Sequence, residues 1–193
     1  QPQTKEVRTI QPEWLSYFAV QDVKVKLKAY FPDKTSSVIE LASLLAGKMY
    51  TMDLGFQRVN SLFAKQVTYY DVWVEDTALT PVRLSYIQRY VLSAEYKDNA
   101  QYFIFENSLG GIDTVLMDGE TKSKKNPKAL VGKIDGTELE YGMDFSVTYT
   151  QNTGHINSRY KAAWLQDFFL STQKHLLRNG VLLPIVMAKS TIK

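Results

Sequence analysis

The middle of the chain carries two β-type runs on either side of a double glycine. Residues 102–105 are aromatic and aliphatic, Gly110 and Gly111 follow, and a second apolar run covers residues 112–117. Two such runs flanking a double glycine predict a sharp strand-to-strand reversal. A strand pattern rather than a helix pattern follows the glycines, so this segment lacks the helix N-terminus that a phosphate-binding loop needs.

Strand-type patterns recur at short intervals through the first half of the chain. Residues 23–29 alternate apolar residues with lysine, which is typical of a half-buried strand. Residues 36–46 fit either a short helix or a strand, and we favour strand or irregular structure because residues 49–59 alternate again. Residues 67–75 and 84–96 are rich in β-branched and aromatic residues. These patterns predict an immunoglobulin- or fibronectin-III-like β-sandwich over residues 1–106, with a loose lead-in at residues 1–20.

The second half of the chain has a different pattern. Residues 121–128 (TKSKKNPK) predict a basic loop, and strands are expected around residues 130–134 and 143–150. Residues 158–170 predict the one clear helix, because Leu165, Phe168 and Phe169 are spaced i, i+3 and i+4 and form an apolar stripe.

A hairpin pattern follows the helix. Asn179 and Gly180 lie between two apolar runs, and Pro184 indicates that the second run is an edge strand or a bulge. Residues 190–193 fit a last short strand. We therefore expect a smaller α+β module over residues 107–193, which makes the whole chain mainly β with one helix.

Composition excludes several classes of protein. The chain has 193 residues, a net charge of +3 and no cysteine. The charge is too weak to indicate nucleic acid by itself, and the lack of cysteine excludes disulfides and thiolate metal sites. No apolar stretch approaches the length of a membrane span. The first ten residues have neither an initiator Met nor an apolar signal core, so we expect a mature form or a piece of a longer protein.

Catalytic patterns are missing from the sequence. It contains no HExxH, GxSxG, GxGxxG or Walker-type motif, so we expect no enzyme and no cofactor. His155 and His175 are each isolated, and we interpret both as structural or solvated. The acidic residues of the stretch 134–144 (IDGTELEYGMD) fit a calcium loop less well than a solvated turn between strands.

Aromatic and basic side chains are the remaining candidates for recognition. Exposed tyrosine and tryptophan can stack on sugars or build a protein interface, and a lysine cluster can contact an anionic partner. The candidate ligand or interface residues are Trp14, Trp73, Tyr86, Tyr90, Lys122, Lys124 and Lys125.

Three segments carry a family resemblance. Residues 105–115 (FENSLGGIDTV), 164–171 (WLQDFFLS) and 182–186 (LLPIV) together resemble uncharacterised proteins of Bacteroidetes genomes, some in prophage-like or tail-associated neighbourhoods. The resemblance brings no catalytic residues. It implies a module of a larger virion-like or surface assembly, and hence a virion-like or extracytoplasmic location.

The leading hypothesis is therefore a non-catalytic structural or interaction module whose partners are other protein subunits. The alternative is a carbohydrate-binding module, which needs exposed tryptophan or tyrosine rings on one face. We expect no metal, no nucleic acid and no membrane span.

Overall fold

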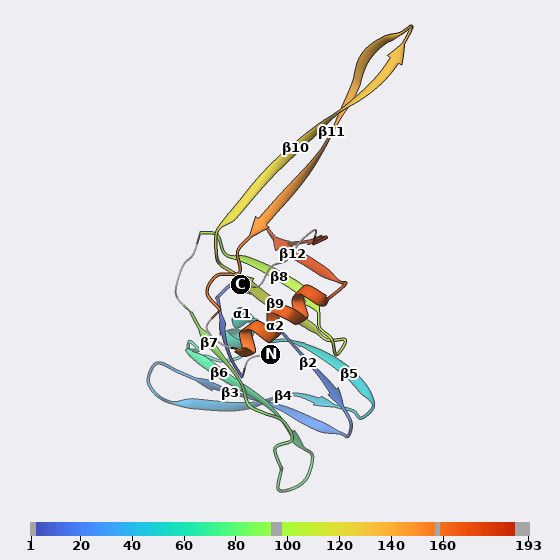
Figure 1. The fold of residues 1–193 in the computed structure, drawn as a ribbon. Coiled ribbons are helices and arrows are strands. Elements are labelled where there is room, and N and C mark those ends of the chain that lie inside the picture. The colour runs from blue at the N-terminus through green and yellow to red at the C-terminus, as the bar shows by residue number, and fades with distance from the viewer. Residues whose placement is uncertain (1–2, 94–97, 157–158, 188–193) are drawn as a thin grey trace. The chain divides into compact units, whose positions relative to one another are not determined.

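The computed structural model describes residues 3–93, 98–156 and 159–187, and these residues form a mainly β protein with two helices and several sheets (Figure 1). The chain divides into two compact units. Unit 1 comprises residues 1–96, 101–116 and 156–193, and unit 2 comprises residues 97–100 and 117–155. This division differs from the boundary expected at residue 106, because strands on both sides of that residue belong to one sheet.

A five-stranded sheet forms the first layer of unit 1. Its strands, in spatial order, are β1 (Thr4–Val7), β7 (Gln88–Leu92), β6 (Tyr69–Asp76), β3 (Val23–Tyr30) and β4 (Ser36–Leu44). The β1–β7 pair is parallel and the other pairs are antiparallel. The alternation predicted for residues 23–29 is confirmed, because Val23, Val25, Leu27 and Ala29 are buried while the intervening lysines are half-buried.

A two-stranded ribbon packs against the core side of this sheet. It consists of β2 (Trp14–Ala19) and β5 (Lys48–Asp53), which pair antiparallel, and the short helix α1 (Phe56–Ser61) follows β5. Leu15, Tyr17, Tyr50 and Met52 of the ribbon pack on the buried residues of the sheet. The strand expected at residues 49–59 is therefore too long: it ends at Asp53, because buried Phe56 and Val59 belong to a helical turn.

Two further sequence interpretations are resolved in this region. The ambiguous segment 36–46 contains strand β4, as favoured. The expected strand over residues 84–96 is shorter than its composition suggested, because only Gln88–Leu92 pairs with a neighbour, while residues 94–97 lie outside the described residues.

A second, four-stranded sheet of unit 1 has the order β13 (Val181–Pro184), β12 (Lys174–Arg178), β8 (Gln101–Glu106) and β9 (Ile112–Met117). The reversal predicted at the double glycine is confirmed: the Asn107 amide donates to the Gly111 carbonyl at 2.7 Å. The Asn179–Gly180 hairpin is also confirmed, with φ of 51° and 77° as a tight primed turn requires. Pro184 lies on the edge strand, where a missing amide costs no ladder bond.

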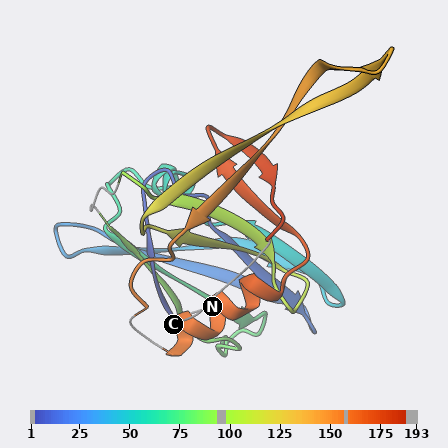
Figure 2. The same ribbon diagram turned by 45° about the horizontal axis from the view of Figure 1, so that its top comes forward.

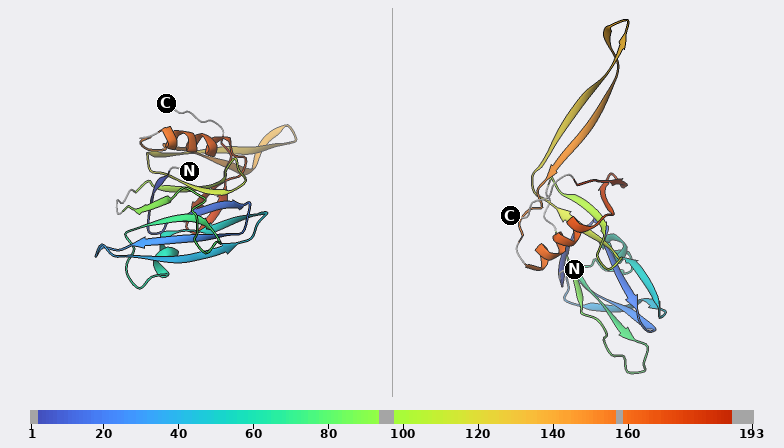
Figure 3. Two further views of the ribbon diagram at one scale, coloured as in Figure 1. Left: turned by 90° about the horizontal axis from the view of Figure 1, so that it is seen from below. Right: turned by 45° about the vertical axis from the view of Figure 1, so that its right-hand side comes forward.

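Helix α2 (Arg159–Leu170) covers one side of this four-stranded sheet (Figure 2). The predicted stripe makes the contact: Leu165 and Phe168 are buried, and the Phe168 ring meets Phe103 and Phe105 edge-on at centroid distances of 5.7 and 5.3 Å. Viewed from below, unit 1 shows α2, the four-stranded sheet and the first sheet as successive layers (Figure 3). The short strand expected at residues 190–193 lies outside the described residues.

Unit 2 is built around one long hairpin, β10 (Thr121–Ile134) and β11 (Thr137–Gln151), which we call the arm (residues 121–151). Asp135 and Gly136, with φ of 51° and 82°, form its turn. The basic loop predicted for residues 121–128 is therefore wrong. Lysine, asparagine and proline have weak strand propensity, but pairing with the β-branched and aromatic residues of β11 overrides it.

Candidate functional site

The aromatic residues singled out from the sequence do not form one surface. Trp14 begins β2 and is half-buried, while Tyr86 lies before β7 with 88% of its surface exposed. Trp73 and Tyr90 lie on neighbouring strands of the first sheet, but only Tyr90 faces the core. Tyr90 is fully buried and stacks on Tyr70 at 4.9 Å, so it cannot contact a ligand at the surface.

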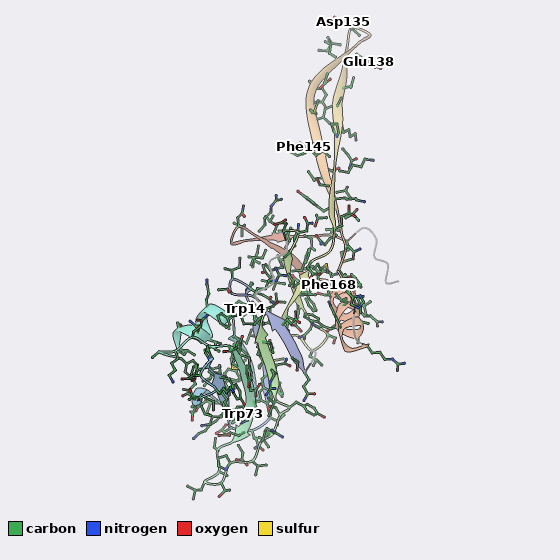
Figure 4. The ribbon with its side chains drawn as sticks, turned by 90° about the vertical axis from the view of Figure 1, so that its left-hand side faces the viewer. Trp14, Trp73, Asp135, Glu138, Phe145 and Phe168 are labelled. Atoms are coloured by element: carbon green, nitrogen blue, oxygen red, sulfur yellow. The ribbon has the colours of Figure 1, made fainter. Side chains whose placement is uncertain are left out.

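The solvent side of the first sheet carries Trp73 (Figure 4), whose indole donates to Glu75 at 3.3 Å. The rings of Tyr30 and Tyr69 stack at 4.2 Å, with Lys28 over Tyr30 and Arg89 over Tyr69. Arg89 also donates two hydrogen bonds to Asp71, at 2.7 and 2.8 Å, and these bonds raise the pKa of the guanidinium. The rings of Tyr30 and Tyr69 are thus already engaged by protein groups rather than free to stack on a sugar.

A buried polar cluster joins four segments of unit 1. Lys5 of β1 donates to Glu13 at 2.5 Å, to the Thr114 carbonyl at 2.7 Å and to Asp113 at 3.3 Å. Its ammonium also lies 4.5 Å from the centre of the Trp164 ring, and the Trp164 indole donates to Asp113 at 3.0 Å. The cluster therefore ties β1, the segment before β2, strand β9 and helix α2 together.

Burial and charge compete at Glu13. Its side chain is fully buried, and burial raises the pKa of its carboxyl to about 7, although the nearby Lys5 opposes the shift. Gln11 donates a second hydrogen bond to the same carboxylate at 3.1 Å. Glu13 in turn raises the pKa of the buried Tyr70 and Tyr90, whose own burial is the larger cause.

This buried cluster holds the fold and offers no surface to a substrate. Lys5 is 4% exposed and Asp113 is 1% exposed. No sequence pattern points to it: Lys5 lies in the expected lead-in, and it contacts a residue 108 positions away along the chain.

Among the described residues, no three histidine, aspartate or glutamate side chains gather as a metal site. His155 is exposed near the end of unit 2, and His175 is half-buried on β12.

Many of the large exposed apolar side chains among the described residues lie on the arm: Val131, Ile134, Leu139, Tyr141, Met143, Phe145 and Tyr149. In the register of the hairpin, Lys125, Pro127 and Ala129 of β10 share a face with Val147, Phe145 and Met143 of β11. We call this set, with Tyr149, the apolar arm face. Met143 is 64% exposed and Phe145 is 66% exposed, values far from those of core residues. Figure 4 shows Phe145 along the ribbon and Asp135 and Glu138 at its turn.

The opposite face of the arm is polar in the stem, and towards the tip it carries Leu130, Ile134 and Leu139. Lys122, Lys124 and Lys128 lie across from Thr150, Thr148 and Asp144. The predicted lysine cluster is therefore exposed on a strand, with Lys122 and Lys124 on the polar face and Lys125 on the apolar arm face. Lys122 lies 3.2 Å from Glu120. A bulge at Tyr141 of β11, between Gly142 and Glu140, which pair with Leu130 and Val131, marks the change from the stem to the tip of the arm.

Unit 1 has at least two pockets at its surface. The more apolar one, of about 400 Å³, is lined by Ser16, Phe18, Met49, Asn107, Leu109 and Gly111 and contains no ionisable side chain.

Neither helix among the described residues is long and apolar enough to cross a membrane. The chain matches no family model, no curated protein and no solved structure.

Proposed function

We propose that this chain is a non-catalytic structural or interaction module that assembles with other protein subunits through its arm. The observation that carries the proposal is the apolar arm face, whose large side chains are exposed in a sheet of only two strands. A two-stranded hairpin is at best marginally stable in water, and a long one with an apolar face gains stability when another surface covers it.

The energy available from such coverage is substantial. Burying a large apolar side chain contributes about 1.5–3 kcal/mol, and Met143, Phe145 and Tyr149 are each at least half exposed. In the stem, the lysines on the opposite face keep that side in water, so association there is directed to one side of the ribbon.

The resemblance to Bacteroidetes proteins extends the proposal to a phage tail-like or surface assembly, in a virion-like or extracytoplasmic setting. We also propose that residues 3–93 act as an immunoglobulin- or fibronectin-III-like scaffold. Its support is a mostly antiparallel sheet and a two-stranded ribbon around one core. The carbohydrate-binding alternative depends on exposed Tyr86 and half-buried Trp73, and a glycan array tests it.

Light scattering coupled to size-exclusion chromatography tests the assembly role. The full chain is run over a concentration range, alone and mixed with the proteins encoded beside its gene. Phe145→Asp should weaken assembly, whereas Ser146→Asp puts the same charge on the polar face of the arm and should leave assembly intact. A wild-type chain that stays monomeric and binds none of these neighbours would refute the proposed function.

A further inference from the structure

The arm is charged unequally along its length. Its stem carries Lys122, Lys124, Lys125 and Lys128 against one acidic residue, Asp144. Its tip carries Asp135, Glu138 and Glu140 against one basic residue, Lys133, which lies 3.4 Å from Glu138. The stem is therefore net positive and the tip net negative.

The same inequality exists on the apolar arm face itself. Lys125 lies on this face in the stem, in register with Val147. Val131 is two residues beyond Ala129 on β10 and therefore lies on this face. Its partner beyond the bulge, Glu140, lies on the same face at the tip. One face of the arm thus presents Lys125, a central apolar stretch and Glu140 in order, followed by the ion pair of Lys133 and Glu138.

We infer that the occupant of the apolar arm face is the arm of a second copy of this chain, lying antiparallel to the first. An antiparallel pair places the acidic tip of each copy over the basic stem of the other, whereas a parallel pair would place lysines over lysines. The contact is isologous, so one surface that is complementary to itself suffices for both copies. This inference rests on the proposed function, since it names the partner of the same surface.

The register locates the contacts. A two-fold axis between the pairs Pro127–Phe145 and Ala129–Met143 brings Phe145 of one copy against Met143 of the second copy. Lys125 and Val131 lie equally far along β10 from this axis, so the Lys125–Val147 pair of each copy faces the Val131–Glu140 pair of the other, and Lys125 lies diagonally across from Glu140. Both charged residues belong to exposed positions, and neither takes part in the buried cluster of unit 1.

A charge-swap experiment tests this geometry on the full chain. Lys125→Glu opposes two glutamates in each contact and Glu140→Lys opposes two lysines, so each variant alone should self-associate about tenfold more weakly or worse. Mixing the two variants should restore association to near the wild-type level, because both contacts then join a lysine to a glutamate. Lys124→Glu, on the polar face, is the matched control and should associate like wild type.

Cysteine crosslinking gives an independent readout, because the natural chain has no cysteine. Met143→Cys, near the axis, should form disulfide-linked dimers under mild oxidation. Ser123→Cys and Lys133→Cys should crosslink to each other in a mixture, and neither should crosslink to itself. Self-crosslinking of Lys133→Cys, or a mixture of charge-swap variants that stays dissociated, would overturn the antiparallel pair. If the chain assembles with a neighbouring protein while the charge swaps have no effect, this inference fails and the proposed function stands.

Discussion

Replacing Lys5 by methionine should cost far more stability than the same replacement at the surface. Methionine keeps the apolar length of lysine but removes the ammonium that contacts Glu13, Asp113 and the Thr114 carbonyl. Removing one partner of a buried ion pair typically costs about 3–5 kcal/mol, because a charge is left buried without compensation. That is a large part of the roughly 5–15 kcal/mol that stabilises an ordinary domain.

The size of this loss should depend on pH. Lys5 lowers the pKa of Glu13 through its charge and its hydrogen bond, so the variant will have a pKa at Glu13 above the wild-type value of about 7. At pH 8 the variant must bury an ionised carboxylate or bind a proton against the bulk pH. At pH 5 Glu13 is protonated in the folded variant, and Asp113 still accepts from the Thr114 amide and the Trp164 indole, so the loss should be smaller.

Urea unfolding of wild type, Lys5→Met and Lys65→Met at pH 5 and pH 8 measures the effect. Lys65 forms an exposed ion pair with Asp33 at 2.6 Å, with the two side chains 55% and 49% exposed. Loss of such a pair should cost no more than about 1 kcal/mol. Equal losses for the two variants, or a Lys5→Met loss that is the same at both pH values, would refute the argument.

Three other predictions follow from unit 1. The pKa of Glu13 is about 7 in the folded state and 4.5 in the unfolded state, so its contribution to stability is complete below pH 4.5 and is lost as pH rises through 7. Glu13→Gln should remove this decline. Urea unfolding across this pH range checks it, and a variant whose stability falls with pH as the wild type's does would contradict the prediction. Phe168→Ala should cost about 3–5 kcal/mol, while Leu170→Ala, at a position 73% exposed, should stay within about 0.5 kcal/mol in the same denaturation assay. Gly180→Ala should cost roughly 1–2 kcal/mol because its φ is 77°; thermal melting checks this, and an unchanged melting temperature would count against the primed turn.

Local patterns in the sequence predicted local structure well. The stripe of Leu165 and Phe168 predicted α2, and Asn179 with Gly180 predicted the last hairpin, because each signal is contained within a few residues. The β10 strand could not be predicted in the same way. Its lysines and Pro127 favour a loop locally, and only the register with β11 makes them a strand.

The candidate surfaces required knowledge of long-range contacts. Alternation in a strand does not say which side faces the core, so Trp73 and Tyr90 were equally good candidates until the sheet placed only Tyr90 inside. The buried cluster joins Lys5 to Asp113, which are 108 positions apart, and no periodicity connects those positions. The lysine cluster is visible in the sequence, but the division of its lysines between two faces of the arm depends on strand pairing.

Unit 1 and the arm differ in whether their side chains need a partner. The buried ions of unit 1 satisfy one another, and the stacked tyrosines of its first sheet are covered by their own cations, so neither needs a partner. The arm differs, because its apolar side chains are exposed while Pro127 and the lysines of β10 discourage edge pairing on that strand. Protection of one edge leaves the apolar arm face and the β11 edge as the available surfaces. Of these, only the face combines apolar area with a charge order that complements itself, which is why we assign association to it.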